Sequence, residues 1–135
     1  MPKPEGSLTA AQYEIMEAAW DHGGQGATVA EIWQAIAPRR PIGRTTILNL
    51  VDRLEKRGWL TRRGKANPFR YLPALDRQQT AALVVGGFLD DFFAGSAGSL
   101  VMSLLGSNRI TPDDLLRLRD ALERPDREGG QGKGE

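Results

Sequence analysis

The stretch from residue 44 to residue 64, RTTILNLVDRLEKRGWLTRRG, constrains the fold most. The spacing of its apolar residues changes within it, from that of a helix to that of a strand. Its first apolar residues recur with the spacing of one helical face: Ile47, Leu50, Val51 and Leu54. Gly58 follows where a left-handed C-terminal cap is needed, so we expect a helix over about residues 43–57. The next segments, WLTRR and PFRYLP, are short extended runs joined by GKAN, and they predict a β-hairpin.

Two further helices are predicted before this stretch. Thr9 can cap a helix with Gln12 three residues later, and Thr28 can do the same with Glu31. Each capping box precedes a run with helical apolar spacing. Three helices followed by a basic hairpin is the order of a winged helix-turn-helix. We therefore expect such a domain at residues 7–75, preceded by a flexible N-terminus at residues 1–6.

The positive charge of the chain is concentrated in this part of the sequence. Residues 39–71 hold ten Lys or Arg against two acids, a net charge of +8. The rest of the chain, with eight Lys or Arg and fifteen Asp or Glu, carries −7. Such a division indicates a segment that meets a polyanion, attached to a part with another role. A basic solvated face is the alternative.

The N-terminal half of the third helix has the side chains that read bases. Each residue of a helix advances about 100° round the axis, so residues between those of the apolar stripe point away from the core. Arg binds guanine and Asn binds adenine through paired hydrogen bonds, and Thr contacts bases or phosphates. A merely solvated face would favour Glu and Lys at these positions. The candidate base-reading residues are Arg44, Thr45, Thr46 and Asn49.

The cations that follow are placed for the DNA backbone. Asp52 has the wrong sign for this surface, and we expect it to pair with Lys56 one turn later; acceptance from a cytosine amine is the alternative. The hairpin, a wing at about residues 60–72, repeats the positive sign. The candidate phosphate contacts are Arg53, Lys56, Arg57, Arg62, Arg63, Lys65 and Arg70. The alternative function is a winged helix that binds an acidic protein partner.

The second half of the chain predicts a helical dimerisation domain at residues 76–124. Asp76 and Thr111 can cap helices there, and a short helix is expected at SLVMSLLG. Its apolar residues are too many for short helices exposed on a monomer, so a second copy of the chain is expected to cover them. Packing against the winged domain is the alternative. The expected interface residues are Leu83, Val84, Phe88, Leu89, Phe92, Phe93, Leu100, Val101, Leu104, Leu105, Leu115, Leu118 and Leu122.

Several classes of protein are excluded by what the sequence lacks. The chain has no cysteine and one histidine, His22, so it offers no thiolate metal site or disulfide, and we expect no metal, cofactor or enzymatic activity. The pairs Asp90–Asp91 and Asp113–Asp114 point about 100° apart on a helix and do not converge. No signal peptide or uninterrupted apolar span of about 20 residues is present, so we expect a cytoplasmic protein without membrane insertion. The polar tail, residues 125–135, is expected to be disordered.

The sequence resembles the penicillinase and methicillin-resistance repressor family. The resemblance rests on LTAAQYEIMEAAW, TVAEIWQAI, TTILNLVDRLEKRGWLTR, FRYLP and GSLVMSLLG with ITPDDLLRLRDAL, and it covers about residues 8–123. It implies a bacterial transcriptional repressor that binds palindromic double-stranded DNA operators as a homodimer. Family positions that contact the operator correspond to Arg44, Thr45, Thr46, Asn49 and Arg53, together with the wing.

The resemblance also implies how such a repressor is released. In the antibiotic-sensing branch a protease, part of a membrane-linked sensor system, cuts an Asn-Phe bond in the dimerisation segment. The candidate cleavage region here is Met102, Ser103 and Leu104, where Ser103 and Leu104 replace that Asn and Phe. A second branch senses copper through a cysteine-rich tail, which this cysteine-free chain excludes.

Overall fold

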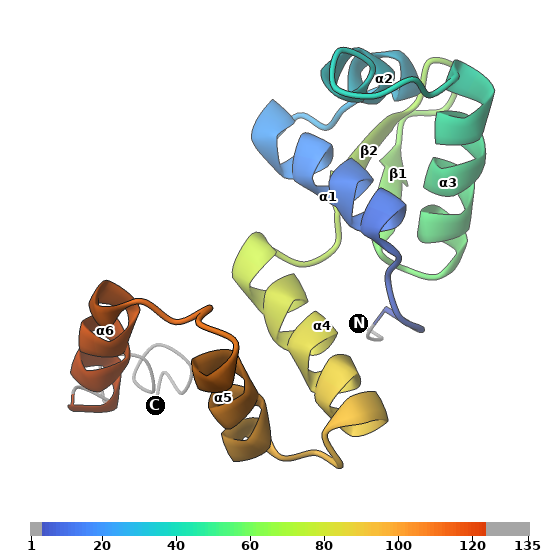
Figure 1. Ribbon diagram of the computed structural model, residues 1–135. Coiled ribbons are helices and arrows are strands. Elements are labelled where there is room, and N and C mark those ends of the chain that lie inside the picture. Colours follow the sequence, from blue (N-terminus) through green and yellow to red (C-terminus); the bar gives the residue numbers. More distant parts are fainter. Residues whose placement is uncertain (1–3, 124–135) are drawn as a thin grey trace. The chain divides into compact units, whose positions relative to one another are not determined.

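The computed structural model describes residues 4–123 (Figure 1). The chain divides into two compact units, Met1–Phe88 and Leu89–Glu135, and each is described by itself. The division falls inside a helix, thirteen residues beyond the predicted domain boundary at residue 75, and that boundary stays a prediction. The predicted disordered tail at residues 125–135 lies outside the described residues.

The first unit contains the predicted three helices and hairpin, so the prediction of a mainly α-helical fold with a small β-hairpin is confirmed. The hairpin strands are antiparallel, in a register that runs from Leu60 opposite Pro73 to Arg63 opposite Arg70. A fourth helix begins in this unit and continues into the next. The elements are α1 (Ala10–His22), α2 (Val29–Ile36), α3 (Arg44–Lys56), β1 (Leu60–Arg63), β2 (Arg70–Pro73) and α4 (Arg77–Phe92).

Both predicted capping boxes are present. The Thr9 hydroxyl accepts from the Gln12 N–H at 3.1 Å, and the Gln12 side chain accepts from the Thr9 N–H at 3.0 Å. Thr28 and Glu31 form the same reciprocal pair at 3.1 and 2.9 Å. These bonds satisfy N–H groups that a helix start leaves without partners, and so they fix where α1 and α2 begin.

The end of α3 is set by Gly58, as predicted. Its φ is +88°, in the left-handed region that favours glycine. The Gly58 N–H donates to the Glu55 carbonyl at 3.1 Å, and the Trp59 N–H donates to the Leu54 carbonyl at 2.9 Å. This pair of bonds is a Schellman motif. It turns the chain directly from α3 into the wing.

One hydrophobic core lies between the three helices and the hairpin of the first unit (Figure 1). The connection between α1 and α2 also joins the hairpin, because Ala27 and Tyr71 exchange backbone hydrogen bonds of 3.0 and 2.8 Å. The Trp20 indole donates to the Leu75 carbonyl at 3.0 Å. The largest apolar side chains of the core are Ile15, Met16, Ile32, Ile36, Ile47, Val51, Leu54, Trp59, Leu60 and Tyr71.

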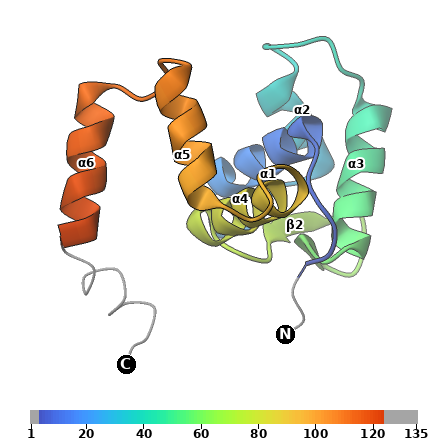
Figure 2. The ribbon, with the colours of Figure 1, turned by 60° about the horizontal axis from the view of Figure 1, so that its bottom comes forward.

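The second unit contains the end of α4, α5 (Ala97–Gly106) and α6 (Pro112–Glu123). Figure 2 shows α5 and α6 as separate helices with a short connection. Ser96 caps α5 through the Ser99 N–H at 3.0 Å, and Thr111 caps α6 through the Asp114 N–H at 3.1 Å. Neither α5 nor α6 contains a buried residue. Among residues 4–123 no single helix meets the length and hydropathy needed to cross a membrane, although α4 and α5 do as a bent pair.

Candidate nucleic-acid interface

The buried side of α3 determines which of its residues face solvent. Ile47, Val51 and Leu54 have no exposed surface, and they fix the rotation of the helix about its axis. The predicted base-reading residues are all exposed, and so is Arg53 one turn after Asn49. Leu48 is the apolar exception on this side, with 48% of its surface exposed. The structure thus leaves Arg44, Thr45, Thr46 and Asn49 exposed in the N-terminal half of α3.

The start of α3 is open as well. Gly43 occupies the N-cap position, and it provides no side chain to accept from the first-turn N–H groups. Such N–H groups, at the positive end of the helix dipole, are suited to a phosphate oxygen. The open start and the polar face therefore lie at the same end of the helix.

Trp33 supports this end of α3, a role that the sequence did not indicate. Its indole N–H donates to the Ile42 carbonyl at 2.8 Å, which ties α2 to the residues that lead into α3. The Arg44 guanidinium lies over the Trp33 ring, with its central carbon 4.9 Å from the ring centre. A cation above an aromatic face is attracted by the ring, so Arg44 is held near the start of the helix.

The predicted pairing of Asp52 with Lys56 is confirmed. The Lys56 ammonium lies 3.1 Å from the Asp52 carboxylate, and both side chains are mostly exposed. An exposed pair of this kind contributes little to stability. Its consequence is local, since it offsets an exposed carboxylate near the predicted phosphate-contact positions.

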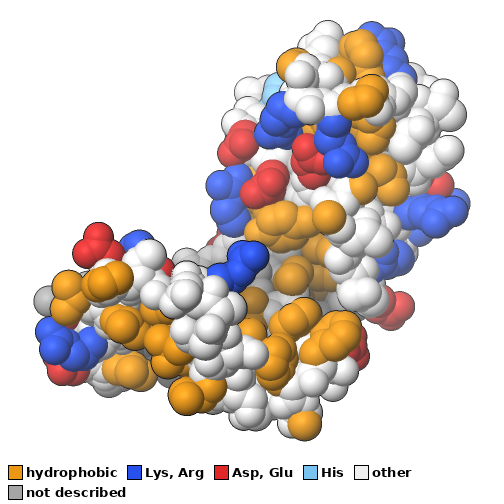
Figure 3. Space-filling model, viewed as in Figure 1, with side chains coloured by type: hydrophobic (Ala, Val, Ile, Leu, Met, Phe, Trp, Pro, Cys, Tyr) orange, Lys and Arg blue, Asp and Glu red, His pale blue; other side chains and the backbone are white. Residues whose placement is uncertain are grey.

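The wing presents a second exposed cationic group. Arg63 and Lys65 are exposed, in a run from Thr61 to Pro68 that is exposed throughout. Arg62 lies over the Phe69 ring at 4.3 Å from its centre. The visible face of the first unit in Figure 3 carries several Lys and Arg side chains.

Arg70 differs from the other wing cations because its guanidinium binds other parts of the protein, although 42% of its side chain is exposed. One terminal nitrogen of its guanidinium donates to the Gly26 carbonyl at 2.9 Å and lies 3.3 Å from Glu31 Oε1. His22 Nε2 lies 3.1 Å from the same oxygen. The contacts of Arg70 therefore join β2 to the start of α2.

The environment of Glu31 favours its ionised form. The hydrogen bond from the Thr28 N–H is the main cause that holds the pKa of the Glu31 carboxyl below its ordinary value of 4.5, against the opposing effect of burial. The charges of His22 and Arg70 act in the same direction as the hydrogen bond. Glu31 was predicted only as a capping residue, and its contact with the wing could not be read from local spacing.

Arg57, another predicted phosphate contact, is half-buried and also binds other parts of the protein. Its Nε donates to the Glu5 carbonyl at 2.9 Å, and a terminal nitrogen donates to the Ser7 carbonyl. Residues 4–7 are thus held against the end of α3, although the sequence predicted a flexible segment there. The structure therefore places Arg57 apart from the exposed cations of α3 and the wing.

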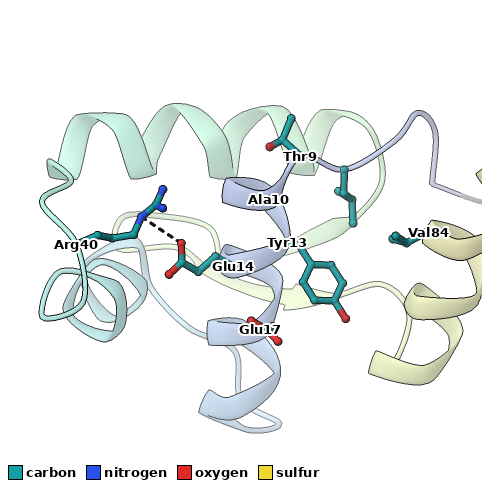
Figure 4. Close-up of a pocket in the computed structure, with 8 residues that line it drawn as sticks. Thr9, Ala10, Tyr13, Glu14, Glu17, Arg40 and Val84 are labelled. Atoms are coloured by element: carbon teal, nitrogen blue, oxygen red, sulfur yellow. Dashed lines mark ion pairs between the residues drawn. The ribbon is translucent and has the colours of Figure 1, made fainter. Parts of the chain in front are cut away.

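Two cations of the basic segment lie beside α1. Arg39 and Arg40 each approach the Glu14 carboxylate at 3.3 Å. Figure 4 shows Glu14 with Arg40 at an open hollow that Tyr13 and Val84 also line. Within residues 4–123 no three His, Asp or Glu side chains are grouped as a metal site would need.

Comparison with known proteins identifies the family. The family described as penicillinase repressor matches residues 8–124. The chain belongs to the penicillinase repressor family. This is a family of DNA-binding transcriptional repressors and not of enzymes, as the sequence predicted.

The relatives in this family match over almost their full length. The penicillinase repressor of Bacillus licheniformis is 23% identical over 116 residues, which cover 86% of this chain and 89% of the relative. The methicillin resistance regulatory protein MecI of Mammaliicoccus sciuri is 23% identical over 117 residues, covering 87% and 94%. A solved structure of monomeric Bacillus licheniformis BlaI in complex with the blaP half-operator is 23% identical, with a TM-score of 0.46, and the match covers 54% of this chain and 87% of that one.

Replacing Glu31 by Gln tests the contacts of Glu31 with His22 and Arg70, which join α2 to the wing. Because the pKa of Glu31 is lowered in the folded protein, its charge stabilises the fold above pH 4.5, and this contribution is lost as the pH falls through the lowered pKa. The variant keeps an oxygen for the capping box. We expect it to be less stable by about 0.5 kcal/mol near neutral pH and equal to the wild type in acid.

Urea unfolding followed by circular dichroism at about pH 7 and about pH 3 measures this difference. Glu17→Gln, at an exposed position of α1, is the control for the loss of one carboxylate. A difference between wild type and Glu31→Gln that is the same at both pH values would contradict the account.

Proposed function

We propose that the protein is a homodimeric repressor that binds palindromic operators, with α3 in the major groove and the wing on the DNA backbone. The observation that carries the proposal is the open polar face of α3, opposite side chains that are fully buried. In a helix-turn-helix domain the recognition helix enters the major groove and its N-terminal residues approach the base edges. The relatives named after penicillinase repression and methicillin resistance are consistent with such a role.

The contacts divide by chemistry. Arg44, Thr45, Thr46 and Asn49 are assigned to base edges, where Arg pairs with guanine and Asn with adenine. Arg53, Lys56, Arg63 and Lys65 are assigned to phosphates, because each is exposed on α3 or the wing. Arg62 joins them from its position over Phe69. Arg57 and Arg70 are assigned to the support of this surface, because their guanidinium groups bind other parts of the fold.

We assign dimerisation to residues 76–124. Hydrophobic side chains gather on the visible face of the second unit (Figure 3). Leu115, Leu118 and Leu122 are exposed on α6 by 45%, 46% and 78%. Their spacing places them on one side of the helix, and a twofold partner would cover them. Of the other expected interface residues, Val84, Phe88, Phe92, Val101 and Leu105 are exposed, and Leu83, Leu89, Phe93, Leu100 and Leu104 are half-buried.

Release by a sensor protease belongs to the same proposal. Met102, Ser103 and Leu104 lie inside α5, and 67% of the Met102 surface is exposed. A protease cuts extended backbone, so cleavage here requires local unfolding of α5. Ser103 and Leu104 also depart from the Asn-Phe bond of the family, and a protease acting here would need a different specificity.

The rival function is binding of an acidic protein partner by the same basic surface. Both functions are electrostatic and weaken with salt, so salt dependence does not separate them. Preference among duplexes of equal length does, because an acidic partner requires no base-reading face. The distinguishing residue is therefore one that reads a base and carries no charge.

Asn49→Ala provides that test. The probe is the duplex that the wild-type protein enriches most from a randomised pool, together with its single-base variants. We expect the substitution to cost roughly 1–3 kcal/mol on that duplex and to relax specificity at one position per half-site. Fluorescence anisotropy against each duplex measures the loss.

Lys65→Ala is the matched control, since it removes a wing cation. It should weaken binding to all duplexes alike. It should also make the slope of log K against log salt less negative by about 0.9, because one phosphate contact is lost. If Asn49→Ala also weakened every duplex by the same factor, the assignment of Asn49 to base reading would be wrong.

Leu118→Glu tests the assignment of dimerisation. A charge on the apolar side of α6 would be desolvated in a twofold interface, so we expect the full-length variant to be monomeric where the wild type is dimeric. Sedimentation velocity at matched concentrations measures the state. Arg119→Glu puts the same side chain about 100° further round α6 and should leave the dimer intact. A Leu118→Glu protein that remains fully dimeric would refute the assignment.

A further inference from the structure

The guanidinium of Arg57 is surrounded by oxygens of the protein itself. Nε donates to the Glu5 carbonyl at 2.9 Å, and Nη2 donates to the Ser7 carbonyl. Nη1 lies 3.4 Å from Gln12 Oε1, the oxygen that also completes the capping box of α1. All three nitrogens are therefore engaged, by acceptors from the residues before α1 and from α1 itself.

The N-terminal strap, defined here as residues 4–7, also binds the two neighbours of Gly58, Arg57 and Trp59. The Glu5 N–H donates to the Arg57 carbonyl at 3.0 Å. The Glu5 carbonyl accepts a second hydrogen bond, from the Trp59 indole at 3.1 Å. The strap thus bridges the last turn of α3 and Trp59, the residue directly before β1.

Gly6 allows this close approach. Gly6 has a φ of +81°, and a Cβ added there would lie 2.7 Å from Nη2 of Arg57. Gly58 is required by its φ of +88° and not by space, because a Cβ there would lie 3.5 Å from the Cα of Pro4, an ordinary van der Waals contact. Any other residue at Gly6 would be strained and would push against the guanidinium.

We propose that Arg57 is a positioning residue for DNA binding: through the strap it sets the angle between the recognition helix and the wing. Trp59 is almost fully buried and leads directly into β1, so a bond from its indole fixes the base of the wing. The strap joins that base to α1 and to the end of α3. This inference rests on the proposed function, and it replaces the expectation that Arg57 contacts a phosphate.

The two roles of Arg57 differ in what they require of the side chain. A phosphate contact requires mainly a positive charge, and Lys provides one. The bonds to Glu5, Ser7 and Gln12 require a planar fork with several donors, which Lys lacks. The role of Arg57 can therefore be separated from its charge by a substitution that keeps the charge.

The test compares full-length Arg57→Lys and Gly6→Ala with the wild type on the enriched duplex, by fluorescence anisotropy. We expect both variants to bind roughly tenfold more weakly, the effect of losing hydrogen bonds to a charged group. Arg39→Lys is the control for the exchange of Arg for Lys, because Arg39 pairs with Glu14 beside α1 and has no assigned contact with DNA, and it should bind like the wild type. Gly24→Ala is the control for a glycine substitution, because its added Cβ would meet no atom within 4 Å.

A double substitution separates displacement of the wing from a general loss of stability, because it compares the effect of Lys65→Ala on DNA binding in two backgrounds. In the wild type, Lys65→Ala is expected to weaken binding. In the Arg57→Lys background it should have almost no further effect, because the wing would already be displaced. Amide hydrogen exchange without DNA should be faster at residues 59–63 in Arg57→Lys and Gly6→Ala and unchanged in α2. The unchanged α2 shows that both variants are folded.

The outcomes separate this inference from the proposed function. If Arg57→Lys binds like the wild type, or if Gly6→Ala changes neither binding nor exchange, the inference is overturned. If the wild type prefers no duplex while both variants loosen residues 59–63, the proposed function fails, and the strap remains as the support of the wing.

Discussion

The burial of one side of α3 is the constraint on which the DNA-facing surface depends. Ile47, Val51 and Leu54 are completely buried, so α3 cannot rotate about its axis without exposing them. Each such side chain contributes about 1.5–3 kcal/mol by leaving water, which makes any other rotation of the helix costly. The exposed polar face, with Thr45 and Asn49, is a geometric consequence of that burial.

The cations of the basic segment serve two different purposes. Arg57 and Arg70 bind backbone carbonyls of distant segments, and they hold the ends of α3 and the wing in place. Arg53, Arg63 and Lys65 are exposed on the same two elements. A rigid support with an exposed charged surface is what preorganised recognition of a polyanion requires. Net charge alone does not distinguish the two groups.

The features that could be predicted from the sequence are those that depend on residues close together in the chain. The capping boxes of α1 and α2, the end of α3 at Gly58 and the pair of Asp52 with Lys56 follow from spacings of four residues or fewer. The contacts of Arg57 with Glu5 and of Arg70 with Glu31 join residues 52 and 39 positions apart, and no local pattern encodes them.

Duplex preference of the wild-type protein tests the central claim, that α3 reads a DNA sequence, most directly. Fluorescence anisotropy would compare the duplex upstream of the protein's own gene with a shuffled duplex of equal length, at two salt concentrations. The account predicts a clear preference for the native duplex that persists at the higher salt. Equal binding to both duplexes, lost at the higher salt, would contradict it and leave α3 as a charged surface without sequence recognition on this DNA.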